Sequence, residues 1–399
     1  MDEHTHEHRP MFLFGSYTSP MPKVTDVTKA VLNGNYRFHT DGRLYPGKCS
    51  AKENSIKAFI RFVYEETEAT NYEDLAYIIS ALSKQDETDR DPIVKPFYKS
   101  IINAIVERPE LQAPAELGIQ FDKSEIISLA RSWIAWVVHQ QLQNIERKQP
   151  IDLINFFNAL ELKRDPAWIC TLNHDLQTEA ALYNLGIKFN NGFIKTETKH
   201  PRFEANEIFR TSSDSKLLKL HGSINWFWKN RKYHEVPVPL SMDDEDYIND
   251  NPAFISGSLN KLEDYTYQIY PWIWAEFQNQ LSKTRRIICS GYGFKDLGVT
   301  SRIDGWLNVF PEARLLIIAP DNAEGDSNGL IENCRKERIG NIGGFFKKKA
   351  EFGNGHEYDI CSSREEVLQS AAHIVVLNEK FENSRKYTDA LRWFAYDSM

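Results

Sequence analysis

The stretch LLKLHGSINW, residues 217–226, places a histidine and a glycine directly after a short apolar run. Residues 217–220 form a run of strand length, and Gly222 breaks it. A histidine at the end of a buried strand can act as a base near neutral pH, and a following glycine lets the backbone approach a ligand. A single histidine of this kind is more often a structural residue, so His221 is a candidate that needs partners from elsewhere in the chain.

Four other apolar runs share this arrangement, each followed or ended by a residue that breaks a strand. They are residues 11–15, 167–172, 286–290 and 315–319. Helical patterns lie between several of these runs, and short strands separated by helices are typical of a mostly parallel sheet. The sequence therefore predicts an α/β fold, a Rossmann-like mostly parallel sheet with helices on both faces. Such sheets bind ligands in the crevice beyond the carboxyl ends of their strands.

A long helical segment follows the first predicted strand. From about residue 54 to 163 the pattern is almost wholly helical, and we interpret it as a large insertion. The insertion belongs to one domain that covers residues 11–377 and closes on a strand at residues 374–377. Residues 1–10 are expected to form a flexible N-terminal tail, and residues 378–399 a C-terminal helix.

Composition narrows the classes of function. The 399 residues carry a formal net charge of −8, so no overall positive field gathers nucleic acid, and direct nucleic-acid binding is not expected. The five cysteines are scattered without a close pair, which fits neither a disulfide framework nor a zinc site and favours a reducing compartment. No apolar stretch approaches the roughly 20 residues of a membrane helix, and residues 1–10 lack the apolar core of a signal peptide. We therefore expect a cytoplasmic protein without membrane contact.

The N-terminal segment also offers a candidate metal site. His4, His6 and His8 alternate, so on a strand they would share a face and could chelate a metal. These histidines precede the first apolar run instead of following a strand, and a flexible tail is the favoured interpretation. We assign no metal.

Two further strand ends carry polar residues. In the segment TLNHD, residues 171–175, the side chains of Asn173 and Asp175 together can hold a carboxamide and a ribose hydroxyl. The alternative is that one of them caps the helix that follows. The segment CSGYGFKD, residues 289–296, opens into a turn of small residues that suits a ribose or phosphate against the main chain, although such turns follow many strands.

Taken together and in this order, the three segments resemble the sirtuin-like (Sir2-like) family, particularly its bacterial branch that hydrolyses NAD in antiviral defence. The family carries a Thr-x-Asn-x-Asp segment, a Leu-His-Gly-Ser segment followed by Trp, and a Gly-Tyr-Ser-Phe-x-Asp segment. The matching residues here are Thr171, Asn173 and Asp175, then Leu220, His221, Gly222 and Ser223 with Trp226, then Gly291, Tyr292, Phe294 and Asp296. The resemblance covers roughly residues 11–320.

The family's first motif, Gly-Ala-Gly-x-Ser, corresponds here to the segment GSYTS, residues 15–19. Gly15 and Ser19 align with the motif. Tyr17 stands where the family has its second glycine, which normally lets the backbone reach the pyrophosphate. Tyr17 therefore either lowers affinity for the dinucleotide or covers it as a lid. The resemblance places Gly15, Ser16, Tyr17 and Ser19 against the NAD molecule.

The resemblance implies NAD as the substrate and assigns roles to the matching residues. Asn173 would orient the ribose and the attacking water, Asp175 would hold the nicotinamide amide, and His221 would engage the ribose hydroxyls as a base. Further NAD-binding residues implied are Thr171, Gly222, Ser290, Gly291, Tyr292, Phe294 and Asp296. Among them, Ser290, Gly291 and Asp296 would face the adenosine half.

The implied activity is that of an NAD glycohydrolase, which cleaves NAD⁺ to nicotinamide and ADP-ribose. Because unregulated hydrolysis would be toxic, we expect activation by a homo-oligomer or by a companion protein such as an ATPase or a nucleic-acid-sensing subunit. One alternative is an inactive nucleotide-binding scaffold subunit of a defence complex. A third, an NAD-dependent protein deacylase, ranks last because the sequence lacks the spacing of a four-cysteine zinc module.

Overall fold

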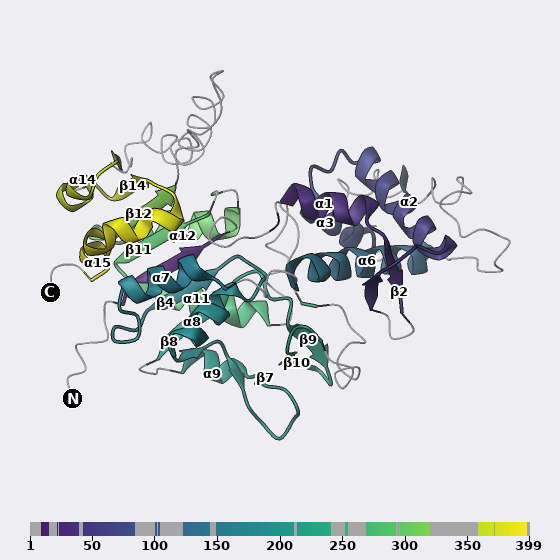
Figure 1. Cartoon of the computed structure of the whole chain (residues 1–399), viewed down its shortest axis with the longest axis horizontal. Coiled ribbons are helices and arrows are strands. Elements are labelled where there is room, and N and C mark those ends of the chain that lie inside the picture. The colour runs from purple at the N-terminus through teal and green to yellow at the C-terminus, as the bar shows by residue number, and fades with distance from the viewer. Residues whose placement is uncertain are drawn as a thin grey trace, which may run out of the picture.

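The chain forms a sheet domain and a lobe of helices beside it (Figure 1). The computed structural model describes residues 9–15, 22, 24–39, 43–83, 100–101, 103, 123–143, 149–210, 214–240, 252–253, 269–292, 294, 296–319, 358–370 and 372–396. The histidines of the expected N-terminal tail lie outside these residues.

The sheet domain is built on an eight-stranded parallel sheet with the strand order β13-β14-β12-β11-β1-β4-β8-β5. Its strands are β1 (Met11–Phe14), β4 (Trp168–Thr171), β5 (Phe189–Asn190), β8 (Ser215–Lys219), β11 (Arg286–Ser290), β12 (Arg314–Ala319), β13 (Tyr358–Cys361) and β14 (Ile374–Asn378). From β1 the chain adds β4 and β8 on one side and then returns to place β11 on the other side. The strand order therefore reverses between β1 and β11, which is where open α/β sheets bind ligands.

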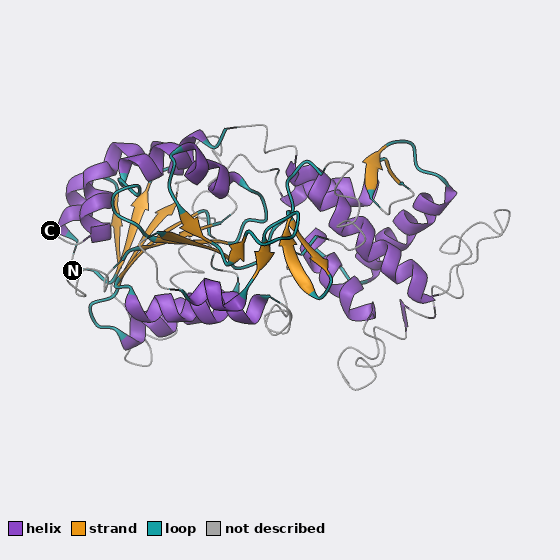
Figure 2. Cartoon of the chain, turned by 90° about the horizontal axis from the view of Figure 1, so that it is seen from below, coloured by secondary structure: helices purple, strands orange, loops and turns teal. Residues whose placement is uncertain are grey.

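Helices cover both faces of this sheet, as Figure 2 shows, so the predicted Rossmann-like α/β fold is confirmed. Because successive strand residues point to opposite faces, Met11 and Leu13 of β1 enter one core while Phe12 and Phe14 enter the other. The first core contains α9 (Ala205–Phe209), α11 (Tyr270–Lys283) and α12 (Leu297–Val309). The second contains α7 (Ile151–Ala159), α8 (Gln177–Asn184), α14 (Arg364–Gln369), the 3₁₀ helix η5 (Phe381–Tyr387) and α15 (Thr388–Tyr396).

The helical lobe has its own apolar core, built from α1 (Val24–Asn33), α2 (Ala51–Glu66), α3 (Tyr72–Ser83) and α6 (Lys123–Gln143). The lobe begins earlier than residue 54, because Val27 and Val31 of α1 pack in its core with Trp133 of α6. It also ends before residue 163, because α7 packs on the sheet, where Phe156 meets Phe14 with ring centroids 5.8 Å apart. The helical lobe therefore both begins and ends earlier in the chain than the expected insertion at about residues 54–163.

Two small antiparallel sheets complete the described structure. A hairpin of β2 (Tyr36–Phe38) and β3 (Leu44–Pro46) belongs to the helical lobe. A second sheet has the order β6-β7-β10-β9, with β6 (Phe193–Ile194), β7 (Arg202–Phe203), β9 (Trp226–Lys229) and β10 (Lys232–Glu235). Ile224 and Phe227 place the segment after His221 in the core of the helical lobe, so the lobe lies against the carboxyl edge of the large sheet.

Candidate functional site

The predicted site segments follow four adjacent strands, and the strand register brings their ends to one edge of the sheet. Phe14 of β1 pairs with Thr171 of β4 on one side and with Ser290 of β11 on the other. Thr171 in turn pairs with Lys219 of β8. The residues after these four positions leave the sheet together, so the segments after β1, β4, β8 and β11 share the carboxyl edge.

Gly15 lies where the backbones of β1 and β11 come closest. Its N–H donates to the Ser290 carbonyl oxygen at 2.9 Å. A Cβ atom at this position would lie 2.4 Å from the Gly291 carbonyl oxygen, so a residue with a side chain would force the two segments apart. Of the other residues predicted in the first motif, Ser16, Tyr17 and Ser19 lie outside the described residues.

Asn173 links the end of β4 to the end of β1. The residue is 6% exposed, and its side-chain Nδ2 donates to the Gly15 carbonyl oxygen at 3.2 Å. Its own N–H donates to Thr171 Oγ1 at 3.0 Å. The first bond fixes the direction of the side-chain amide beside the point where the strand order reverses, and the second holds the backbone that carries it.

Asp175 takes up the helix-starting role that the sequence left open. Its Oδ1 accepts from the N–H of Gln177, the first residue of α8, at 2.8 Å, and the residue is 1% exposed. Such a bond satisfies one of the backbone donors that the first turn of a helix leaves without partners. The expected contact of Asp175 with the nicotinamide amide stays a prediction.

His221 and Asp296 form the closest side-chain pair of the site, with Nε2 2.6 Å from Oδ2. They follow β8 and β11, which are separated in the sheet by β4 and β1, a span of about 14 Å at the usual spacing of strands. The two segments must therefore bridge over the ends of the central strands. Both side chains are largely buried, at 7% and 6% exposed.

Asp296 also begins α12, because its other oxygen, Oδ1, accepts from the N–H groups of Gly298 and Val299 at 2.8 and 3.2 Å. Each oxygen of the carboxyl group thus has its own partner, a helix start on one side and an imidazole on the other. The fixed helix holds Asp296 in place against His221. Sequence reasoning placed Asp296 near the adenosine half of NAD and did not foresee this pairing.

Glycines shape the two segments that carry the pair. Gly222 follows His221 with φ of 85°, and Gly291 follows β11 with φ of 68°, both in the region that favours glycine. Phe294 adopts φ of 55°, an uncommon value for a residue with a side chain. These values set the direction in which each segment leaves its strand.

Tyr292 supports the β11 segment from within. Its hydroxyl donates to the Asp296 carbonyl oxygen at 2.8 Å and lies 2.7 Å from Thr300 Oγ1. Burial raises the pKa of Tyr292 well above its ordinary value, so it stays a neutral donor. Ser290 Oγ donates to the Ile318 carbonyl oxygen at 3.3 Å. The described contacts of these two hydroxyls hold the loop and the strand in place.

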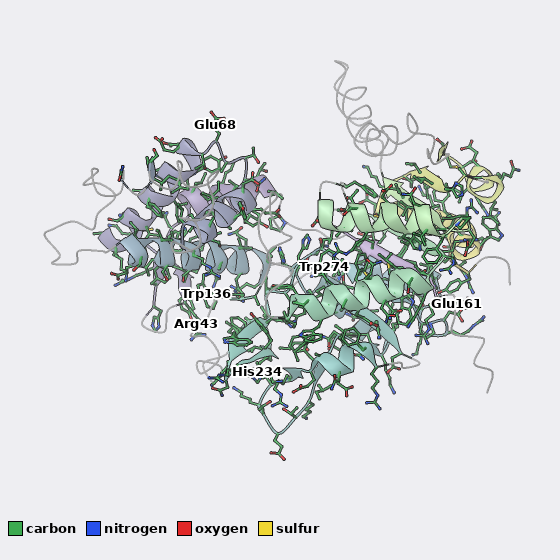
Figure 3. All side chains as sticks on the ribbon, turned by 180° about the vertical axis from the view of Figure 1, so that it is seen from behind. Arg43, Glu68, Trp136, Glu161, His234 and Trp274 are labelled. Carbon is green, nitrogen blue, oxygen red and sulfur yellow. The ribbon has the colours of Figure 1, made fainter. Side chains whose placement is uncertain are left out.

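The segment after β8 is anchored from two other elements. The indole N–H of Trp274 on α11, labelled in Figure 3, donates to the Leu220 carbonyl oxygen at 3.2 Å. The N–H of Ile224 donates to the His174 carbonyl oxygen at 3.0 Å, joining this segment to the one after β4. Anchoring on both sides fixes the position of His221 between them.

Sequence reasoning missed three charged residues beside this edge, Lys219, Glu179 and Glu235. Lys219 is 1% exposed and interrupts an apolar strand, which is a readable signal because a lysine is almost never fully buried unless it is paired. Glu179 lies on α8 and Glu235 on β10, and no local pattern in the sequence brings them to Lys219.

Among the residues that the structure describes, no group of three or more histidine, cysteine or acidic residues could hold a metal ion. Within the same part of the chain, no helix combines the length and apolar character needed to cross a membrane. Cys170 and Cys289 are buried in β4 and β11, where burial raises their pKa well above the ordinary value and keeps both as neutral thiols.

Comparison with known proteins adds no family to this description. No protein-family model matches the chain, and no curated protein matches its sequence.

Proposed function

We propose that the chain is an NAD glycohydrolase that cleaves NAD⁺ to nicotinamide and ADP-ribose. The observation that carries the proposal is the His221–Asp296 pair, whose segments leave the same edge of the sheet as Asn173 and Gly15, where the strand order reverses. Dinucleotides bind at this position in open α/β sheets, and Gly15 leaves the end of β1 without a side chain.

The reaction breaks the bond between nicotinamide and the ribose anomeric carbon, and nicotinamide leaves as a neutral molecule with the bonding electron pair. Water forms the new bond to that carbon and gives up one proton. The transition state resembles an oxocarbenium ion, so the site must hold the ribose and one water in line. Asn173, fixed through its Nδ2, is the proposed orienting residue for the ribose and that water.

His221 is the proposed base. In the tautomer that carries its proton on Nε2, this N–H donates to Asp296. Nδ1 then carries the lone pair that accepts a proton from the substrate side. Asp296 then holds the ring in one tautomer and stabilises it when it becomes charged. The roles that the resemblance gave to Asp175, Thr171, Gly222 and the β11 segment remain part of the proposal.

The proposal extends to control. Depletion of NAD in antiviral defence requires that activity be switched on, and we propose a homo-oligomer or a companion protein as the switch. Ile224, three residues after His221, packs in the core of the helical lobe, so a partner bound to that lobe has a structural route to the site.

The test is NAD turnover by the purified full chain, with and without candidate partners. We expect His221→Ala and Asn173→Ala each to lower the rate by about 100-fold or more, because each removes a positioned group. Arg364→Ala, which changes an exposed ion pair far from β8, is the control and should behave as the wild type. Equal rates of nicotinamide release by the wild type and both site variants would refute the proposal.

A non-catalytic nucleotide-binding subunit is the second candidate. It is favoured by two residues. The carboxylate of Asp175 accepts a hydrogen bond from the first turn of α8, and Tyr17 stands where the family's first motif has its second glycine. Binding of NAD without release of nicotinamide under any of these conditions would favour it.

A further inference from the structure

A second polar cluster lies behind the candidate site, next to the segment after β4. It contains Lys219 from the end of β8, Glu179 from α8, Glu235 from β10, and the amides of Asn191 and Asn225. None of these side chains has a role in the proposed reaction. Lys219 joins the cluster to Asp175, whose carbonyl oxygen accepts a hydrogen bond from its ammonium group.

Lys219 connects two strand ends that carry the proposed chemistry. Its ammonium group donates to the Asp175 carbonyl oxygen and, at 2.8 Å, to Glu179 Oε1. Lys219 itself is two residues before His221 in the chain. An ammonium group loses much hydration free energy on burial, so these two bonds are needed to hold it there. The lysine therefore ties the segment of Asn173 and Asp175 to the strand that leads to His221.

Glu235 faces this ion pair from the small antiparallel sheet. Its Oε1 accepts from Asn191 Nδ2 at 3.0 Å and from Asn225 Nδ2 at 3.4 Å. Burial and the nearby Glu179 carboxylate raise the pKa of Glu235 to about 7, against the opposing effect of Lys219. The exposed side chain of Tyr183 on α8 also lies near both carboxyl groups.

Two acceptor oxygens of the cluster lack a donor. Glu179 Oε2 and Asn225 Oδ1 are buried without a hydrogen-bond partner among the described residues. One ammonium group also balances only one of the two carboxylates. A proton on Glu235 supplies both a missing donor and the missing charge balance, whereas its loss leaves a second negative charge beside Glu179.

We propose that Lys219 is a positioning residue for the segment of Asn173 and Asp175, and that its cluster with Glu179 and Glu235 makes this positioning depend on pH. The catalytic consequence rests on the proposed function, whereas the positioning itself does not. When Glu235 is neutral, Lys219 is paired with Glu179 and holds Asp175. When Glu235 is ionised, it competes for the ammonium group and loosens that hold.

The chain supplies a matched control on the same strand. Lys216 is 2% exposed, pairs with the buried Glu276 and donates to the Ile208 carbonyl oxygen at 2.7 Å. It thus has the same two kinds of partner as Lys219. Lys216 pairs with Trp168 at the amino end of β4 and contacts none of the site segments, so Lys216→Met reproduces the loss of a buried ion pair away from the site.

The first experiment compares Lys219→Met with Lys216→Met in the full chain by amide hydrogen exchange of residues 173–178. We expect exchange of this segment to quicken about tenfold or more in Lys219→Met and to stay within about twofold of wild type in Lys216→Met. Lys219→Arg should restore most of the protection. Unchanged exchange in Lys219→Met, or equal changes in both methionine variants, would overturn the proposal.

If either methionine variant does not fold, Glu179→Gln and Glu276→Gln are compared in place of the two methionine variants. Each keeps an acceptor for the lysine and removes one charge, so the same contrast in exchange is expected at smaller size. NAD turnover is then measured on the same proteins, with kcat lowered about tenfold by Lys219→Met and KM changed less. Wild type that does not cleave NAD with or without candidate partners would refute the proposed function, and the exchange result would still decide the role of Lys219.

The pH arm uses Glu235→Gln. After correction for the intrinsic effect of pH on exchange, the wild-type segment should lose protection as pH rises through about 7. Glu235→Gln cannot ionise and should lose this change, whereas His221→Ala should keep it. A pH effect that persists in Glu235→Gln would show that another group controls the segment.

Discussion

The two ends of strand β8 bury the same kind of ion pair in different surroundings. At the amino end, Lys216 and Glu276 are joined by Gln280, which belongs to the same helix as Glu276. At the carboxyl end, Lys219 and Glu179 meet groups from separate elements, including Glu235 of β10, whose pKa burial and Glu179 raise to about 7. The comparison shows that the chemistry of a buried pair does not by itself indicate a site. The position of the pair in the sheet decides, because open α/β sheets bind ligands at the carboxyl edge.

The largest expected effect comes from breaking the ion pair of Lys216 and Glu276 at the amino end of β8. Lys216→Met leaves Glu276 buried without its cation, and we expect the free energy of unfolding to fall by about 3 kcal/mol. Turnover per folded molecule should not change. Denaturant unfolding monitored by circular dichroism measures the first quantity, and an NAD assay of the folded protein the second. A loss of turnover as large as that of Lys219→Met would remove the distinction between the two ends.

The next effect concerns Asp296 at the carboxyl edge. Asparagine starts helices about as well as aspartate, so Asp296→Asn should leave the free energy of unfolding nearly unchanged. It removes the charge that fixes the His221 ring, and we expect NAD turnover to fall by about 100-fold. Unaltered kcat in a stable Asp296→Asn protein would show that the pair is structural, like the pair of Lys216.

The fold could be predicted from the sequence further than the site could. Strands β1, β4, β8 and β11 precede the candidate segments, and each is an apolar run ended by a residue that breaks a strand. That signal is local in the sequence. The order of the strands is not local. Neither is the contact of His221 with Asp296, which depends on two loops crossing over the ends of two other strands.

The limits of local patterns also explain the differences in domain boundaries. The apolar spacing of α1 predicts a helix, but only its packing against Trp133 shows that it belongs to the helical lobe. Strand β13 and the small sheet containing Glu235 escaped prediction because their strands are short and lack a continuous apolar run. Glu235 thus reaches Lys219 through tertiary structure alone.

The smallest expected effect is the dependence of stability on pH at the carboxyl end. Glu235 has a pKa of about 7 in the folded chain against an ordinary value of 4.5. Between these values the unfolded chain loses its proton while the folded chain keeps it, so the free energy of unfolding falls as pH rises and then levels off above about 7. Relative to wild type, Glu235→Gln should therefore gain about 2 kcal/mol between pH 5.5 and 8. Thermal unfolding at both pH values measures this gain, and Glu276→Gln should not show it.

The central claim is that loops from four strands surround a dinucleotide where the strand order reverses. A crystal structure of the full chain with ADP-ribose tests it most directly. We predict the pyrophosphate against the backbone of Gly15 and the ribose nearest nicotinamide within hydrogen-bond distance of Asn173 and His221. ADP-ribose bound elsewhere, or no binding at millimolar concentration in the presence of an active control protein, would contradict the account.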